Sequence, residues 1–204
     1  MGIDVISWVA VVFVLISAAS MLTVRDWRFA LGALALQYLA AFWLVSRHLP
    51  FAMSSIKLIA GWMTIAILGI TRLNQTELDT DADTIHTGGT IFQAILMGIV
   101  ALSAAGATPL IENAIPGMGL PVIMGGLALI GAGVINLGMT SDILRVTIGL
   151  LTMLSGFEII YAAVESAILV TGLLALVNLG LGILGSYLLL AGYIPLTSPE
   201  EEEL

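Results

Sequence analysis

The stretch VISWVAVVFVLISAASML at positions 5–22 is predominantly apolar and carries no charged side chain. At 1.5 Å per residue, an α-helix of this length spans roughly 27 Å, close to the ~30 Å hydrocarbon core of a bilayer. Lipid tails cannot hydrogen-bond a backbone, so such a run crosses a membrane as a helix. The preceding MGID lacks the basic segment of a secretory signal peptide. The run therefore predicts a first transmembrane helix.

Six further apolar runs resemble the first. They lie at 29–45, 51–70, 90–107, 120–137, 143–163 and 167–191. The whole chain of 204 residues is 59% hydrophobic and only 10% charged, whereas a soluble domain carries about 25% charged residues. We therefore predict an all-α protein, a polytopic integral membrane helix bundle of about seven transmembrane helices.

Polar and turn-forming residues separate these runs. Pro50 opens the third run, Pro109 and Pro116 interrupt the chain between the fourth and fifth, and Glu165 weakly divides the last two. We expect one membrane domain over 1–204. Its expected parts are an N-terminal three-helix unit (1–72), an acidic cytoplasmic loop (73–89), the fourth helix with an outer loop (90–117), a second three-helix unit (118–192) and an acidic cytoplasmic tail (193–204).

The distribution of arginine predicts the orientation. Cytoplasmic loops of membrane proteins are enriched in Lys and Arg. With the N-terminus outside, Arg25, Arg28, Arg72 and Arg145 all fall on the cytoplasmic side, and only Arg47 falls outside. We therefore expect the N-terminus out and the C-terminus in.

Composition also limits the chemistry. The absence of cysteine excludes disulfides, iron–sulfur clusters and thiolate metal sites on this chain. The net charge of −8 argues against nucleic acid as a partner. The sequence shows no zinc-protease, phosphate-loop or dinucleotide-binding motif. We expect no catalytic site, metal or cofactor on this chain, and we expect lipids and other membrane subunits as its partners.

Two ionisable residues fall inside apolar runs: Lys57 and Glu158. A charge at the bilayer centre costs at least ~2.5–3.5 kcal/mol on insertion scales. Both lie roughly 8–10 Å from the outer ends of their predicted helices, so an ion pair is geometrically possible. The alternatives are that Lys57 extends to the outer interface and that the helix ends early, leaving Glu158 interfacial. A pair could relay protons or simply neutralise two buried charges.

Several weaker polar candidates accompany this pair. Amide and hydroxyl side chains in membrane helices can hydrogen-bond across helices, which contributes on the order of 1 kcal/mol. By default we interpret them as contacts that hold helices together. The candidates are Gln37, Thr64, Gln93, Asn136, Asn178 and Arg145.

Short motifs in both halves resemble a known family. In the first half they are VRDWR at 24–28, Gly32, Gln37, IKLI at 56–59 and LGITR at 68–72, which resemble hydrogenase-4 component E. In the second half they are DILR at 142–145 and IGLLTML at 148–154, which resemble the K subunit of complex I and its relatives in Mrp-type antiporters. The resemblance implies a subunit, without an active site of its own, of a redox-linked membrane complex that moves protons or sodium ions beside antiporter-like partners. It also implies a location in the inner (cytoplasmic) membrane of a bacterium.

This sequence departs from the family pattern at its acidic positions. Leu151 stands where the resemblance places a glutamate, and Glu158 lies seven residues later on nearly the same helix face. The last helix has no acid, and its nearest polar residue is Asn178. Three hypotheses remain: an ion-translocating subunit, a structural subunit that packs or anchors partners without its own ion path, and a small stand-alone transporter.

Overall fold

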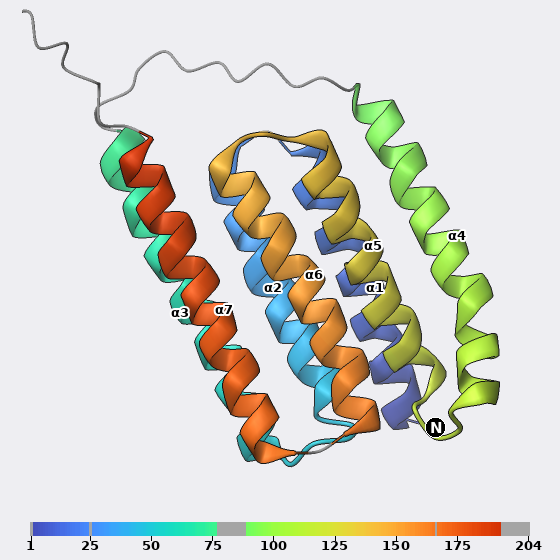
Figure 1. Ribbon diagram of the computed structural model, residues 1–204. Helices are drawn as coiled ribbons and strands as arrows, with labels where there is room; N and C mark the ends of the chain where they lie inside the picture. Colours follow the sequence, from blue (N-terminus) through green and yellow to red (C-terminus); the bar gives the residue numbers. More distant parts are fainter. Residues whose placement is uncertain (1, 25, 77–88, 166, 193–204) are drawn as a thin grey trace, which may run out of the picture.

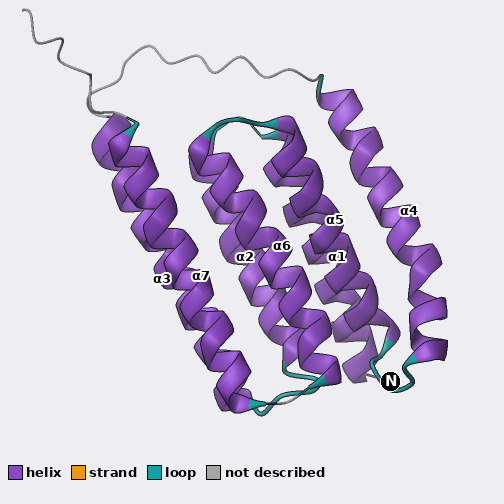
Figure 2. Ribbon diagram, in the orientation of Figure 1, coloured by secondary structure: helices purple, strands orange, loops and turns teal. Residues whose placement is uncertain are grey.

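The computed structural model describes residues 2–24, 26–76, 89–165 and 167–192. Within these ranges the chain forms α-helices joined by short loops, and none of the described residues forms a β-strand (Figure 2). The helices are α1 (Gly2–Thr23), α2 (Trp27–Val45), α3 (Phe51–Thr76), α4 (Thr90–Ala114), α5 (Leu120–Met139), α6 (Ile143–Val164) and α7 (Ile168–Ala191) (Figure 1).

Each apolar run of the sequence forms one of these helices. All seven are long and apolar enough to cross a membrane, which confirms the prediction of an all-helical bundle and indicates a multi-pass membrane protein. The membrane orientation stays a prediction, as does the division into smaller units. The tail at 193–204 and most of the expected loop at 73–89 lie outside the described residues.

Helices α3 and α4 exceed their predicted lengths the most. Helix α3 continues past position 70 to Thr76, so the first residues of the expected acidic loop are helical. Helix α4 was expected to end at 107 but continues through Pro109 to Ala114. Proline removes one backbone donor and usually interrupts a helix. In membrane helices, neighbouring groups compensate for this loss more often.

The helices run alternately up and down (Figure 1). The start of α1, the loops at 46–50 and 115–119, and the end of α6 beside the start of α7 lie at one end of the bundle, which we call the N-terminal end. The end of α1, the start of α2 and the loop at 140–142 lie at the opposite end. Helices α1, α2, α5 and α6 form the centre, with α4 at one edge and the α3–α7 pair at the other. Helix α7 packs more extensively against α3 than against α6.

Glycines allow α5 and α6 to approach closely. A Cβ added at Gly156 would lie 2.5 Å from the carbonyl oxygen of Gly126 and 2.8 Å from the backbone nitrogen of Ile130. A Cβ at Gly133 would lie 2.7 Å from the backbone nitrogen of Met153. Small residues permit such contacts between membrane helices, where packing drives association. This contact fixes the position of α6, which carries Glu158.

Candidate functional site

An ion pair joins α3 to α6 in the interior of the bundle. Lys57 lies six residues after the start of α3, and Glu158 lies six residues before the end of α6. Both positions are therefore roughly 9 Å from the N-terminal end of the bundle. Nζ of Lys57 lies 2.8 Å from Oε2 of Glu158, with side-chain exposures of 8% and 0%. The structure thus places the two sequence candidates together and away from the surface.

The second carboxylate oxygen of Glu158 lacks such a contact. Its Oε1 is buried without a hydrogen-bond partner in the described part of the chain. An isolated charge in a low-dielectric interior is strongly unfavourable, and pairing offsets this cost only when the remaining lone pairs are also satisfied. The pair is therefore incompletely compensated by the surrounding protein.

A group of hydrogen-bonded side chains lies deeper in the bundle than the ion pair. The hydroxyl of Tyr38 donates to Oδ1 of Asn178 at 2.9 Å. The hydroxyl of Thr64 donates to the carbonyl oxygen of Ala60 at 3.0 Å and lies 3.4 Å from the same Asn178 oxygen. Tyr38, Asn178 and Thr64 are almost fully buried. They connect α2, α3 and α7 through polar atoms in the middle of the bundle.

Three further polar residues lie beside this group. Thr152 donates weakly to Oε1 of Gln37, at 3.5 Å. Ser155 lies one turn from Glu158 on α6, and its buried Oγ has no aligned hydrogen-bond partner among the described residues. The amide nitrogens of Gln37 and Asn178 also lack one there. We call the whole set the polar seam: Lys57, Glu158, Tyr38, Ser155, Thr64, Asn178, Gln37 and Thr152.

Three of the sequence candidates lie elsewhere. Gln93 is half-buried on α4, and the other two are Asn136 and Arg145. The side-chain amide of Asn136 donates to the carbonyl oxygen of Arg145 at 3.3 Å. The Arg145 guanidinium in turn donates to the carbonyl oxygens of Met21 and Val24 at the end of α1, at 3.4 and 2.8 Å. A cation at a helix C-terminus interacts favourably with its unpaired carbonyls. Asn136 and Arg145 thus stabilise the end of the bundle opposite the N-terminal end.

Sequence reasoning missed Tyr38, Thr152 and Ser155. Tyrosine, serine and threonine are common in membrane helices, so their presence alone gives no signal. The spacing of polar residues along one helix is informative, because residues three or four positions apart share a helix face. Thr152, Ser155 and Glu158 follow this spacing on α6. They line the face that α6 turns toward the polar seam.

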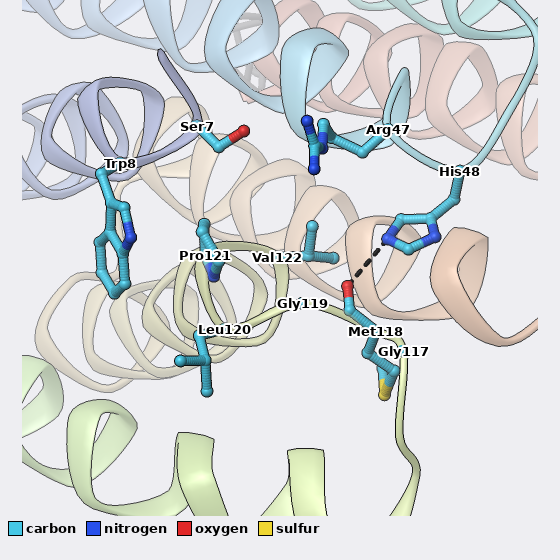
Figure 3. Close-up of a pocket in the computed structure, with 10 residues that line it drawn as sticks. All are labelled: Ser7, Trp8, Arg47, His48, Gly117, Met118, Gly119, Leu120, Pro121 and Val122. Atoms are coloured by element: carbon cyan, nitrogen blue, oxygen red, sulfur yellow. Dashed lines mark hydrogen bonds between the residues drawn. The ribbon is translucent and has the colours of Figure 1, made fainter. Parts of the chain in front are cut away.

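A separate pocket of about 600 Å³ lies at the N-terminal end of the bundle (Figure 3). The loop after α2 contributes Arg47 and His48, and the loop before α5 contributes Gly117 to Gly119. Nε2 of His48 lies 2.8 Å from the carbonyl oxygen of Met118, so the ring nitrogen donates (Figure 3). The ion pair does not line this pocket. Among the described residues, no three His, Cys, Asp or Glu side chains gather as metal ligands.

Comparisons with known proteins give no relative for this chain. No protein-family model, no curated protein and no solved structure matches it. The class that the fold defines is therefore an all-helical, multi-pass membrane protein. The more particular resemblance to hydrogenase-4 component E and the K subunit stays a prediction from the short motifs.

Proposed function

We propose that this chain is a membrane subunit of a multi-subunit, redox-linked complex that translocates protons or sodium ions. The observation that carries the proposal is the buried Lys57–Glu158 pair, whose atoms lie 2.8 Å apart and which forms part of the polar seam. Within this proposal the pair is the group that takes up and releases charge. The complex lies in a bacterial inner membrane, with the N-terminus of this subunit outside.

Energetics supports a functional reason for the pair. Replacing a buried ion pair by apolar residues of similar volume is often neutral or stabilising, by about 1–4 kcal/mol. Apolar residues would therefore pack α3 against α6 at least as stably as this pair of charges does. Ionisable residues inside membrane helices typically mark ion pathways or proton relays. Glu158 and Lys57 fit this description through burial, pairing and the polar groups next to them.

The features of the chain favour a subunit over an enzyme. The polar seam contains one acid and one base together with amides and hydroxyls, a set that can hold and transfer charge but offers no means of electron transfer. The motifs that resemble component E and the K subunit imply antiporter-like neighbours. Much of the surface of α4 and α7 is apolar and exposed, as in Leu102 and Leu169, so lipids or neighbouring subunits surround these helices.

A structural subunit is the second candidate. Leu151 is a buried apolar residue at the position where the family resemblance places an acid, and Asn178 is neutral. In that case Lys57 and Glu158 only neutralise one another. A small stand-alone transporter is the third candidate, but within the described residues each helix is continuous. Many transporters bind their substrates at paired broken helices.

Extraction in mild detergent tests the first part of the proposal. We expect large antiporter-like subunits to co-purify with this chain. Recovery as a stable protein without partners, together with ion flux when it is reconstituted alone, would instead support the stand-alone transporter.

The variant Glu158→Gln tests the ion path. Glutamine keeps the shape of the side chain but cannot take up a proton, and positioned proton-transfer groups contribute roughly 10²–10⁴-fold to rates. We expect ion movement coupled to turnover of the complex to fall by at least about 100-fold. The matched control is Glu165→Gln, at the exposed end of α6. Unchanged coupling in Glu158→Gln would favour the structural subunit.

A further inference from the structure

The unpartnered atoms near the ion pair differ in what they can bind. Oε1 of Glu158 and Oγ of Ser155 are buried on α6 without a hydrogen-bond partner among the described residues, and so is Nδ2 of Asn178 on α7. Glu158, Ser155 and Asn178 are at most 1% exposed. A carboxylate oxygen only accepts hydrogen bonds, a hydroxyl both accepts and donates, and an amide nitrogen only donates. An ion that is handled here therefore meets donors as well as acceptors.

Contacts between helices gather these residues around Tyr38. Its hydroxyl donates to Oδ1 of Asn178 at 2.9 Å, and Ser155 and Glu158 lie within electrostatic range of Tyr38. Ser155 and Glu158 are one turn apart on α6, so their Cβ atoms lie roughly 5–6 Å apart on one helix face. The unpartnered atoms therefore surround one buried tyrosine, beside the ammonium group of Lys57.

This arrangement is unfavourable for a sodium ion. Hard cations bind several oxygen ligands at once, but Oε2 of Glu158 already contacts Nζ of Lys57 at 2.8 Å, and Oδ1 of Asn178 already accepts the Tyr38 hydroxyl. A cation at Oε1 would also lie near the Lys57 ammonium, and like charges repel strongly in a low-dielectric interior. Helices α2, α3, α5 and α7 carry no second acid that could offset this repulsion.

Other titratable groups lie away from this site. Among the helices that pack against α6, α5 has none. On α6 itself, Tyr161 stacks on Phe157, which is 48% exposed, and Tyr187 on α7 is 65% exposed. The ion pair and Tyr38 are therefore the titratable groups of the site. Three arginines lie roughly 15 Å or more from it along their own helices, namely Arg28 on α2, Arg72 on α3 and Arg145 on α6.

We propose that the ion taken up at the Lys57–Glu158 pair is a proton rather than a sodium ion, and that the Ser155 hydroxyl passes it on. The proton adds to Oε1 of the Glu158 carboxylate as an O–H bond, which requires a single oxygen and leaves Oε2 beside Lys57. The Ser155 hydroxyl gives up its own proton and takes another from its opposite side, so it stays neutral. The inference rests on the proposed function, because it names the ion handled at the same site.

Ser155 is suited to this role because its hydroxyl is not held by the backbone. Hydroxyls in helices often donate to the carbonyl oxygen one turn back, as Thr147 on the same helix does to Ile143 at 2.8 Å. Oγ of Ser155 has no such partner among the described residues, although it is buried. Its proton is therefore available to Glu158, directly or through an internal water of the kind that commonly satisfies buried polar atoms.

Measurements of both ions test the identity of the ion. The full-length chain, with any subunits that co-purify, is reconstituted into liposomes under a potassium diffusion potential; an internal pH-sensitive dye reports protons and radioactive sodium reports sodium. We expect proton entry to be equal with and without sodium and to be lost in Glu158→Gln, with no sodium uptake above that of empty liposomes. Thermal unfolding should be equal in sodium and potassium chloride, since an ion that binds the folded state raises its stability.

The variant Ser155→Ala tests the hydroxyl. We expect proton entry to fall about tenfold, less than the roughly 10²–10⁴-fold contributed by a positioned acid or base. The ratio of the rates in H2O and D2O should rise as well, because proton transfer then limits the rate, whereas a purely structural loss would leave the ratio unchanged. The matched control is Ser103→Ala at an exposed position of α4, which should keep the rate and the ratio of the unmodified protein. Thermal unfolding identifies the variants that remain folded.

The possible results separate this inference from the proposed function. Sodium uptake that resists a protonophore, or stabilisation by sodium that Glu158→Gln removes, would overturn the proton assignment but keep Glu158 as the group that carries charge. A normal rate and an unchanged isotope ratio in folded Ser155→Ala would overturn the role of the serine. Proton entry that persists in Glu158→Gln, or no entry of either ion, would remove the proposed function together with this inference.

Discussion

Helix α6 presents two different faces to its neighbours. Toward α5, Gly156 brings two backbones together, and a methyl group added there would overlap the backbone of the neighbouring helix. Toward α2, α3 and α7, the same helix presents Thr152, Ser155 and Glu158, several of whose polar atoms are incompletely paired. The glycine face is closely packed, whereas the other face carries polar atoms that lack hydrogen-bond partners among the described residues.

The glycine face of α6 positions the site, whereas the polar face carries the residues that form the site. Close contact with α5 fixes α6 along its axis, since the backbones leave no room for sliding. Glu158 is consequently held at the same depth as Lys57. Incomplete pairing on the polar face lowers the stability of the protein, as is common at functional sites. The predictions below perturb one face at a time, beginning with the largest expected effect.

Removing one partner of the ion pair should destabilise the protein most. Lys57→Met leaves the Glu158 carboxylate buried without its cation, and breaking a buried pair in this way costs about 3–5 kcal/mol. Thermal unfolding in detergent measures the loss. In the double variant Lys57→Met/Glu158→Leu both charges are absent, and we expect its stability to return to that of the unmodified protein or exceed it. Equal stability of the single variant and the unmodified protein would show that the pair is not buried.

A substitution on the glycine face should have the next largest effect. Gly156→Ala introduces a methyl group 2.5 Å from the carbonyl oxygen of Gly126, and overpacking of this kind costs about 1–3 kcal/mol. The matched control is Gly106→Ala on α4, where nothing lies within 4 Å of the added Cβ. That change should be neutral or stabilising by up to about 1 kcal/mol. A smaller loss for Gly156 than for Gly106 would contradict the packing described for α5 and α6.

The smallest effect is expected inside the seam. Tyr38→Phe removes the hydroxyl that donates to Oδ1 of Asn178. Hydrogen bonds between membrane helices contribute about 0.6 kcal/mol on average. We expect a loss of this order in the free energy of unfolding, because the phenyl ring remains in the apolar cluster that contains Leu34 and Leu68. A loss as large as that of Lys57→Met would place Tyr38, rather than the ion pair, at the centre of the seam.

The fold was largely predictable because the membrane imposes a length on each helix. Runs near 20 apolar residues gave the seven helices in the right places. The ends were less predictable. Helix α3 reaches Thr76 through a mostly polar segment, and α4 continues through Pro109. Hydropathy marks where a helix leaves the apolar layer, whereas the helix itself ends where its hydrogen bonding ends.

The site was predictable only in part. Equal depths suggested that Lys57 and Glu158 could meet, and the structure places them 2.8 Å apart. No feature of the sequence distinguishes Asn178, which belongs to the polar seam, from Asn136, whose side-chain amide donates to the carbonyl oxygen of Arg145. Both are single amides in apolar helices. Their different roles depend on which helix faces them, and packing between distant segments decides that.

Ion coupling in the double variant Lys57→Met/Glu158→Leu tests the central claim most directly. This variant removes both charges together, so it should fold, accumulate and assemble with its partners like the unmodified protein. We predict that ion translocation by the assembled complex is nevertheless lost, because the seam then has no group that can carry charge. Assembly with normal translocation would contradict this account and assign the pair to packing alone.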